Sequence, residues 1–218
     1  MTELRQRLSS LYSGSALQKG YTALKLSIIP FEQFSHYLPK EGRILEVGSG
    51  YGYVSNYLSL ENPNRKVIGN DPAHDRTALA KSTIGSRTNI EFVSTDCREI
   101  VDGGFDGVVI ADVLHHVPYA QQANILEDVY RKLKPGGVLV IRETDIKFRL
   151  RYFIFNYALE WVLYLGTEKL KFRRADAWRR MLEAVGFTVQ HTIPNPRFFP
   201  YITVLFVCSK HQEARRAS

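Results

Sequence analysis

The amino-acid sequence predicts an α/β fold with a doubly wound, mostly parallel sheet and an antiparallel final strand. From Arg43 onward, short apolar segments of strand length alternate with segments of helical periodicity. This alternation is typical of a parallel sheet with helices on both faces. The first strand leads directly into a glycine-rich turn that opens a helix. Near the C-terminus, a proline-rich loop joins two strand-like segments with no helix between them, and this implies an antiparallel pair.

Apolar and β-branched segments mark the predicted strands. In chain order they are residues 44–47, 66–69, 90–94, 105–111, 138–142, 187–191 and 201–208. The helices predicted between them are residues 54–60, 77–83, 119–133 and 176–185. We expect residues 134–137, with the sequence Lys-Pro-Gly-Gly, to form a turn that closes the third of these helices. Gly186 ends the fourth.

Residues 1–42 are predicted to form an N-terminal helical cap. The apolar residues that recur there at helical spacing are Leu4, Leu8 and Leu11. Gly14 and Gly20 are expected to interrupt the helical pattern. We expect this cap to act as a lid beside the glycine turn, and a helix that merely covers the sheet is the alternative.

Composition indicates an ordinary globular protein with a basic surface. The chain has 218 residues, 44% of them hydrophobic and 23% charged, which fits one domain with a sizeable core. The net charge of +7 favours acidic partners such as nucleic acid, anionic lipid or an acidic substrate, or it serves only solubility. Two cysteines predict neither a disulfide framework nor a metal site. With no apolar leader and no long uncharged apolar run, the sequence predicts a cytoplasmic protein.

The glycine turn is the most informative stretch. Gly48, Gly50 and Gly52 follow the first strand in the pattern G-x-G-x-G. The dinucleotide fingerprint G-x-G-x-x-G does not match, because Tyr53 occupies the position of its third glycine. Such a turn brings backbone N–H groups close to a ligand. Acidic residues stand at the carboxyl ends of the predicted strands, where ligands of parallel sheets bind: Glu46, Asp71, Asp96, Asp112 and Asp145.

This stretch resembles motif I of class I S-adenosylmethionine-dependent methyltransferases, an acidic residue followed by G-x-G-x-G. Later segments match in order: Asp71 after the second strand, Asp96-Cys97 after the third, FDGVVIADVLHHVP at the fourth and LKPGGVLVI at the fifth. The resemblance spans residues 43–210, is closest to the small-molecule branch, and implies a seven-stranded, Rossmann-like methyltransferase domain. Residues 211–218 are expected to form a frayed tail.

The resemblance implies S-adenosyl-L-methionine as the cofactor. It places these residues in the cofactor site: Glu46, Gly48, Ser49, Gly50, Asp71, Pro72, Asp96, Cys97, Ala111 and Asp112. Asp71 would accept hydrogen bonds from the ribose, Asp96 would accept one from the adenine amine, and Glu46 would balance the amino or sulfonium charge. The alternatives are that Asp71 and Asp96 cap helices, and that Glu46 is a surface carboxylate.

Catalytic candidates are His116 and Asp145, either of which could face the acceptor. We expect His115 to have a packing or hydrogen-bonding role. A dedicated base is not required when the acceptor is already nucleophilic, because the protein then mainly aligns the two reactants. No metal site is predicted, and nothing near Cys97 clearly activates it as a nucleophile.

Residues from about 145 to 175 resemble a substrate-recognition insertion, in which basic residues flank a dense aromatic and aliphatic run. Such a segment could receive a fatty or aromatic molecule with an acidic head, or touch an anionic membrane surface. An ordinary buried helix is the alternative. The sequence thus predicts a methyltransferase for a small, apolar, lipid-like or aromatic acceptor. The alternatives are a nucleic-acid methyltransferase and a non-catalytic S-adenosylmethionine-binding protein.

Overall fold

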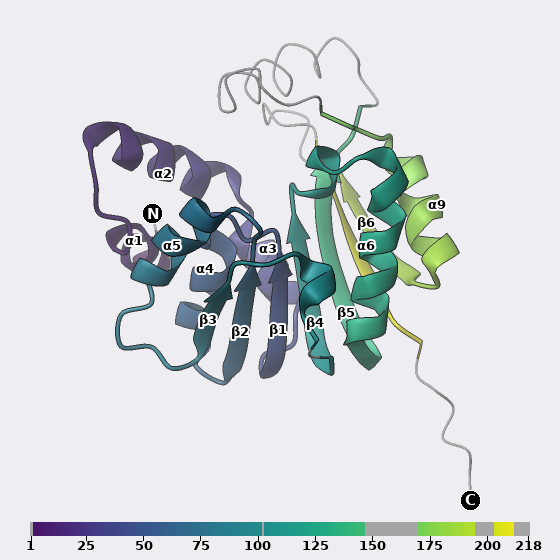
Figure 1. Ribbon diagram of the computed structural model, residues 1–218, viewed down its shortest axis with the longest axis horizontal. Coiled ribbons are helices and arrows are strands. Elements are labelled where there is room, and N and C mark those ends of the chain that lie inside the picture. The colour runs from purple at the N-terminus through teal and green to yellow at the C-terminus, as the bar shows by residue number, and fades with distance from the viewer. Residues whose placement is uncertain (1, 102, 147–169, 195–202, 212–218) are drawn as a thin grey trace, which may run out of the picture. The chain divides into compact units, whose positions relative to one another are not determined.

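The computed structural model describes residues 2–101, 103–146, 170–194 and 203–211. It confirms the predicted mostly parallel, seven-stranded sheet. The strand order is β3-β2-β1-β4-β5-β7-β6, and β7 is antiparallel to its two neighbours. The chain divides into two compact units, residues 1–109 and 110–218, which are described in turn (Figure 1).

The first unit contains three parallel strands and the helices that follow them. Its strands are β1 (Gly42–Val47), β2 (Arg65–Asn70) and β3 (Ile90–Val93), and β4 (Phe105–Ala111) crosses into the second unit. Strand β1 pairs with β2 in a register that places Ile44 beside Val67. The helical elements are α4 (Tyr53–Glu61), α5 (His74–Ser82) and the short 3-10 helix η1 (Cys97–Glu99). Residues 44–47 are all buried, as expected for a strand covered on both faces.

Three further helices precede the sheet: α1 (Glu3–Ser10), α2 (Ala16–Ile28) and α3 (Phe31–Tyr37). Arg5 joins them, because its guanidinium donates to the backbone carbonyls of Leu26 and Ile29 and pairs with Glu32 at 2.6 Å. The prediction that Gly20 interrupts a helix is wrong, since this residue lies inside α2. A β-carbon at Gly20 would have no atom within 4 Å, so no packing contact requires glycine at this position of the helix.

The second unit is built on an antiparallel arrangement. It contains β5 (Leu133–Thr144), β6 (Thr188–Pro194), β7 (Thr203–Ser209), the 3-10 helix η2 (Leu114–His116), α6 (Tyr119–Lys132) and α9 (Ala175–Val185). Strand β7 lies between β5 and β6, and its register runs from Val138 beside Ser209 to Thr144 beside Thr203. The predicted antiparallel pairing of the last two strands is confirmed.

Several predicted boundaries need correction, most clearly at β5. The turn predicted at residues 134–137 lies within the bounds of this strand. Gly136 has a φ of 76°, and its N–H donates to the Lys210 carbonyl at 3.1 Å. The Lys210 N–H in turn donates to the Gly137 carbonyl at 2.9 Å. A left-handed glycine therefore lets the backbone bend while hydrogen bonding beyond the end of β7 continues.

Other elements differ by a few residues. Helix α5 begins at His74, three residues before the predicted start, and β6 extends to Pro194. Most of the predicted insertion, from residue 147 to residue 169, lies outside the described residues, as does the proline-rich loop from residue 195 onward. Among the helices that are described, none has the length and apolar character needed to span a bilayer.

Candidate functional site

The glycine turn adopts a conformation that requires glycine. Gly48, Gly50 and Gly52 have φ values of 72°, 52° and 80°, all in the left-handed region. The Ser49 N–H donates to the Asn70 carbonyl at 2.8 Å, which ties the turn to the end of β2. A β-carbon at Gly52 would lie 2.5 Å from Cζ of Phe92, so this position also needs glycine for packing. The turn is thus fixed by backbone geometry and by the neighbouring strand.

Asp71 organises the turn from the end of β2. This buried residue accepts the Gly50 N–H at Oδ2 and the Ala73 N–H at Oδ1, both at 2.8 Å. A carboxylate offers about four acceptor positions, so two remain for a ligand. Asp71 therefore supports the start of α5, and its capacity to accept ribose hydroxyls is retained. Pro72 follows it on the surface.

Glu46 lies inside the first unit. It is 3% exposed, so the alternative of a surface carboxylate is wrong. Its Oε2 accepts the Ser55 N–H at 2.8 Å and also the Ser55 hydroxyl, in the first turn of α4. Burial raises the pKa of Glu46 to about 8, although the hydrogen bonds from Ser55 lower it, and the negative charge of Asp71 raises it further. An adjacent cationic group would favour the ionised form.

Asp96 caps η1 and pairs with Arg98. Its Oδ1 accepts the backbone N–H of Arg98 at 2.9 Å and Nε–H at 2.8 Å, and its Oδ2 lies 2.6 Å from the guanidinium Nη2. The Arg98 hydrogen bonds lower the pKa of Asp96 to about 2. The helix-cap alternative is thus realised, and the contact with adenine stays a prediction. The Arg98 side chain is 50% exposed, and the neighbouring Cys97 is buried.

Two buried polar atoms near the turn lack a hydrogen-bond partner among the described residues. They are the Ser49 hydroxyl and Oδ1 of Asn70, whose Nδ2 donates to the Thr95 carbonyl at 2.6 Å. Buried polar groups are normally satisfied, so such atoms call for a water or a ligand. Together with Asp71, these groups suit a molecule with several hydroxyl and amino groups, and S-adenosylmethionine fits that description.

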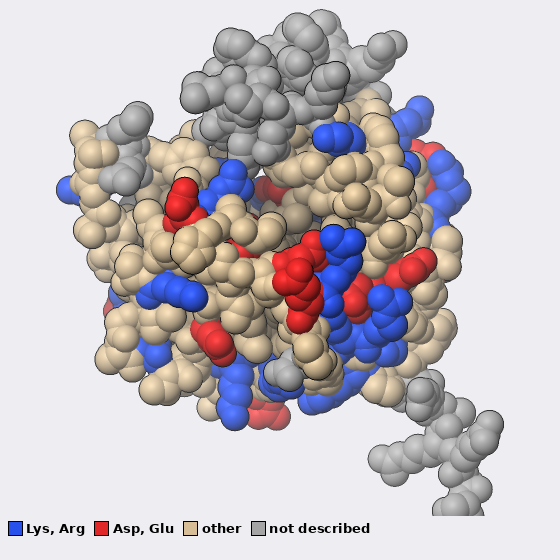
Figure 2. Space-filling view, in the orientation of Figure 1, with Lys and Arg blue, Asp and Glu red and all other residues tan. Residues whose placement is uncertain are grey.

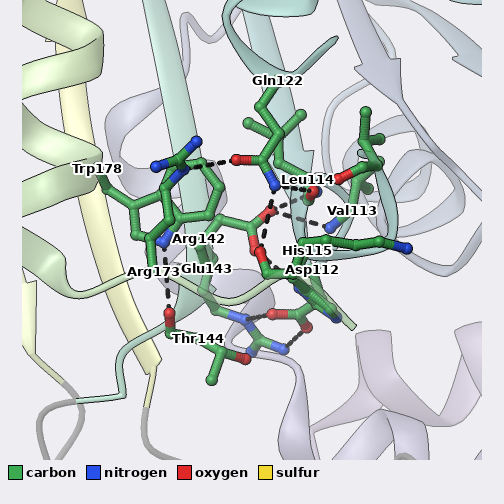
Figure 3. A network of polar contacts seen from close by, with 12 residues as sticks. Asp112, Val113, Leu114, His115, Gln122, Arg142, Glu143, Thr144, Arg173 and Trp178 are labelled. Carbon is green, nitrogen blue, oxygen red and sulfur yellow. Dashed lines mark hydrogen bonds and ion pairs between the residues drawn. The ribbon is translucent and has the colours of Figure 1, made fainter. Parts of the chain in front are cut away.

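The second unit contains the remaining predicted residues and a polar network that sequence reasoning missed (Figure 3). Asp112 has a φ of 58° and forms a two-pronged ion pair with the buried guanidinium of Arg142. Nδ1 of His115 lies 2.7 Å from Oε2 of Glu143, and the His115 ring stacks on Phe172 at 5.0 Å. These contacts agree with the packing and hydrogen-bonding role expected for His115.

The two catalytic candidates lie at the edges of this network. The His116 ring is half-buried, and its centroid is 4.3 Å from that of His115. Oδ1 of Asp145 accepts the Ala175 N–H at 3.1 Å at the start of α9. Ala111 is half-buried at the end of β4. Catalytic roles for His116 and Asp145 stay predictions.

The two central residues of this network, Arg142 and Glu143, have one feature in the sequence that could have identified them. Arg142 and Glu143 are adjacent charged residues at the end of an otherwise apolar strand, and a strand covered on both faces rarely carries such a pair without a reason. Their partners could not be read from spacing. Among the described residues, no group of three or more His, Cys, Asp or Glu is placed to hold a metal ion.

Comparisons with known proteins agree with this geometry. The family model described as a methyltransferase domain matches residues 25–192. The putative methyltransferase YqeM of Bacillus subtilis is 32% identical over 123 residues, a match that covers 53% of this chain and 49% of that protein. The ubiquinone/menaquinone biosynthesis C-methyltransferase UbiE of Geotalea daltonii is 28% identical over 172 residues, 69% of this chain and 72% of that protein.

A third relative and one solved structure are also similar to this chain. The demethylmenaquinone methyltransferase of Thermus thermophilus is 28% identical over 69% of this chain and 76% of its own length. The crystal structure of a SAM-dependent methyltransferase from Methanosarcina mazei matches with a TM-score of 0.67 at 20% identity, covering 85% of this chain and 99% of that chain. The chain therefore belongs to the methyltransferase-domain family, among the class I S-adenosylmethionine-dependent methyltransferases.

Proposed function

We propose that this chain transfers the methyl group of S-adenosylmethionine to a small, lipid-like aromatic acceptor of the quinone class. The observation that carries the acceptor class is the set of relatives named for ubiquinone or menaquinone methylation. Those from Geotalea daltonii and Thermus thermophilus each match 69% of this chain.

In this proposal the first unit holds the cofactor. Asp71 would receive the ribose hydroxyls at its remaining acceptor positions, and Ser49 would supply a hydroxyl to a polar group of the ligand. Glu46 would ionise beside a cationic group, which offsets the cost of burying its charge. Asp96 would meet the adenine amine after the exposed Arg98 side chain swings away.

When bound, S-adenosylmethionine supplies an electrophilic methyl group on a positively charged sulfur. The residues of the chain then need mainly to align an acceptor and exclude water. A reduced quinone ring is electron-rich and can attack through carbon or oxygen without strong activation. The proton released after carbon attack, or the hydroxyl proton after oxygen attack, would pass to solvent or to His116 or Asp145.

The positive charge of the chain gives little support to a nucleic-acid substrate. Figure 2 shows lysine and arginine side chains gathered over the lower ends of α6 and β5. Exposed residues there include Arg131 and Lys134, and Nζ of Lys210 donates to the Leu133 carbonyl at 2.7 Å. This region lies at the start of β5, whereas the candidate residue Asp145 follows its end.

The decisive experiment supplies methyl-labelled S-adenosylmethionine and three acceptors in parallel: chemically reduced demethylmenaquinone, a catechol-type quinol and total RNA. We expect label in one of the quinols, and at least tenfold less with Asp71→Ala. Label only in RNA would overturn the acceptor class. Tight binding of S-adenosylhomocysteine without transfer to any acceptor, including a fractionated cell extract, would favour the non-catalytic alternative.

A lipid-like acceptor also suggests peripheral membrane contact, which the sequence places at residues 148–165, outside the described residues. The test is co-sedimentation with vesicles that contain or lack anionic lipid, at low and high salt. Binding only to anionic vesicles, lost at high salt, would support it. Protein that stays in the supernatant under all conditions would contradict it.

A further inference from the structure

We propose that Arg142 and Glu143 are positioning residues that set the backbone of residues 112–115, which we name the β4–η2 loop. Within the proposed function, on which this inference rests, this loop lies beside the point of methyl transfer. The two residues are neighbours on β5 but act on the loop in different ways. Arg142 holds its first residue by an ion pair, and Glu143 holds the following N–H groups.

Arg142 holds Asp112 by three contacts. Its Nε donates to Oδ1 of Asp112 at 3.0 Å, its Nη2 pairs with Oδ2, and its carbonyl accepts the Asp112 N–H at 3.0 Å. Asp112 is the only non-glycine residue with a left-handed φ within the described part of the chain. Such a conformation costs about 1–2 kcal/mol, so it needs support from surrounding contacts. The fork of the guanidinium provides this support, because it matches a carboxylate in both distance and direction.

Glu143 binds the next three residues of the loop. Its Oε1 accepts the N–H groups of Val113 at 3.1 Å and Leu114 at 2.6 Å, and its Oε2 lies 2.7 Å from Nδ1 of His115 (Figure 3). The carboxylate is completely buried. A single side chain thus satisfies the backbone N–H groups that open η2 and also fixes the plane of the His115 ring.

Successive side chains of a strand point to opposite faces of the sheet, so Arg142 and Glu143 cannot reach the same face. The left-handed φ at Asp112 is the local feature that reconciles the two sets of contacts. It changes the direction of the backbone between Asp112 and Val113. The Asp112 carboxylate can then pair with Arg142 while the Val113 N–H donates to Glu143. The conformation of the loop and the two charged residues therefore depend on one another.

Carbonyl groups of the loop are held as well. Nε2 of Gln122 donates to the Leu114 carbonyl at 2.8 Å, and the Lys171 N–H donates to the His115 carbonyl at 2.7 Å. Gln122 is itself oriented by Arg173, whose Nε donates to Oε1 at 2.6 Å. The loop consequently has little freedom once Arg142 and Glu143 are in place.

Stability alone is a poor explanation for these buried charges. Apolar residues of similar volume often replace a buried ion pair at no loss of stability, because desolvation offsets the attraction. A displacement of about 1 Å between reacting groups can reduce a rate by about 100-fold. The buried charges of Arg142 and Glu143 therefore serve to fix the positions of three residues: Ala111, Asp112 and His116.

The test compares Glu143→Gln and Arg142→Lys with the control Asp128→Asn, all in the 218-residue chain. Glu143→Gln replaces the carboxylate with a neutral amide oxygen, which accepts the two backbone N–H groups more weakly, and it removes the charge that faces His115. A lysine at 142 keeps the charge but cannot form the two-pronged pair. Asp128 is a buried carboxylate of the same unit that pairs with Lys132 on α6 at 2.7 Å and does not contact the loop in the described structure.

We expect kcat to fall about 10- to 100-fold in both loop variants. The Kd for S-adenosylhomocysteine should change less than kcat, because the predicted ribose and turn contacts belong to the first unit and only Ala111 and Asp112 of the predicted cofactor residues lie at the loop. Amide hydrogen exchange should accelerate in peptides that cover residues 112–117. The control should lose melting temperature without a comparable loss of kcat. The proposal is overturned if kcat falls no more than in Asp128→Asn at equal melting temperature, or if exchange in the loop is unchanged.

This design separates the inference from the proposed acceptor. If reduced demethylmenaquinone is not methylated but another fraction of cell extract is, the acceptor proposal fails and the same kcat comparison is made with that fraction. If no fraction is methylated, the proposed function fails, and unchanged loop exchange in both variants would overturn the positioning inference on its own.

Discussion

Oδ2 of Asp71 accepts the backbone N–H of Gly50 at 2.8 Å, so the residue predicted to bind the ribose also holds the glycine turn. The carboxyl ends of β1 and β2 are joined by this contact and by the Ser49–Asn70 hydrogen bond. A change at Asp71 is therefore predicted to affect both the ribose contact and the shape of the turn.

Asp71→Ala should weaken binding of S-adenosylhomocysteine by about 1–3 kcal/mol, because a buried charged acceptor is lost. Asp71→Asn should weaken it less, since its single carbonyl oxygen can still accept the Gly50 N–H. Isothermal titration calorimetry measures both. Equal affinity in wild type and Asp71→Ala would remove the ribose assignment.

Glu46 should make the stability of the ligand-free protein depend on pH. Its pKa is raised from 4.5 to about 8, so the folded state holds a proton across this window that the unfolded state has released. The free energy of unfolding should therefore fall as pH rises from 4.5 to about 8, by up to about 1.4 kcal/mol per pH unit.

Urea unfolding at several pH values checks this slope. Glu46→Gln should flatten it, because glutamine does not titrate and can still accept from Ser55. Glu91→Gln is the matched control, because it removes a carboxylate at an exposed position of β3 and leaves the Glu46–Ser55 contact in place. A slope that persists in Glu46→Gln would assign the pH dependence to another group.

Alanine substitutions at three glycines should separate the cost of a steric clash from the cost of a left-handed φ. Gly52→Ala should destabilise the protein by about 2–5 kcal/mol, because its φ of 80° is strained for alanine and its β-carbon would meet Phe92 at 2.5 Å. Gly85→Ala has the φ strain alone, with no atom within 4 Å, and should cost about 1–2 kcal/mol. Gly20→Ala should stabilise helix α2 by about 0.5–1 kcal/mol. Urea denaturation gives all three values, and a ranking other than this one would contradict the packing described at Gly52.

Tyr12 should couple the N-terminal helices to the glycine turn. Its hydroxyl donates to the Tyr51 carbonyl at 3.0 Å and accepts from Nδ2 of Asn56 at 2.9 Å. Tyr12→Phe should lower the free energy of unfolding by about 1 kcal/mol and also weaken S-adenosylhomocysteine binding, since Tyr51 lies within the turn.

Tyr53→Phe is the matched comparison for Tyr12→Phe. The Tyr53 hydroxyl bonds Thr22 of α2 at 3.0 Å and makes no contact with the turn backbone in the described structure. A similar loss of stability with unchanged S-adenosylhomocysteine affinity is expected. If both variants bind S-adenosylhomocysteine as tightly as the wild type does, the N-terminal helices do not influence the turn.

Much of the fold could be predicted because its signals are local. Strand and helix patterns between residues 43 and 133 need only the hydrophobic period and the positions of glycine and proline, and the elements lie close to the predicted bounds. Errors arose where distant contacts override a local signal. The Pro-Gly-Gly segment lies within β5 because its backbone is hydrogen-bonded to the backbone of Lys210, which is more than 70 residues away in the chain.

The sequence by itself determined the order of the elements, the glycine turn with its acidic neighbours, and the family, because these depend on residue type and spacing along the chain. Only the tertiary structure decided which partner each buried charge has. Glu46 binds Ser55, Asp71 binds Gly50 and Arg142 binds Asp112. The physical reason is that a hydrogen bond depends on distance and direction in space, and both are set only when β1, β2, β4 and β5 take their places in the sheet.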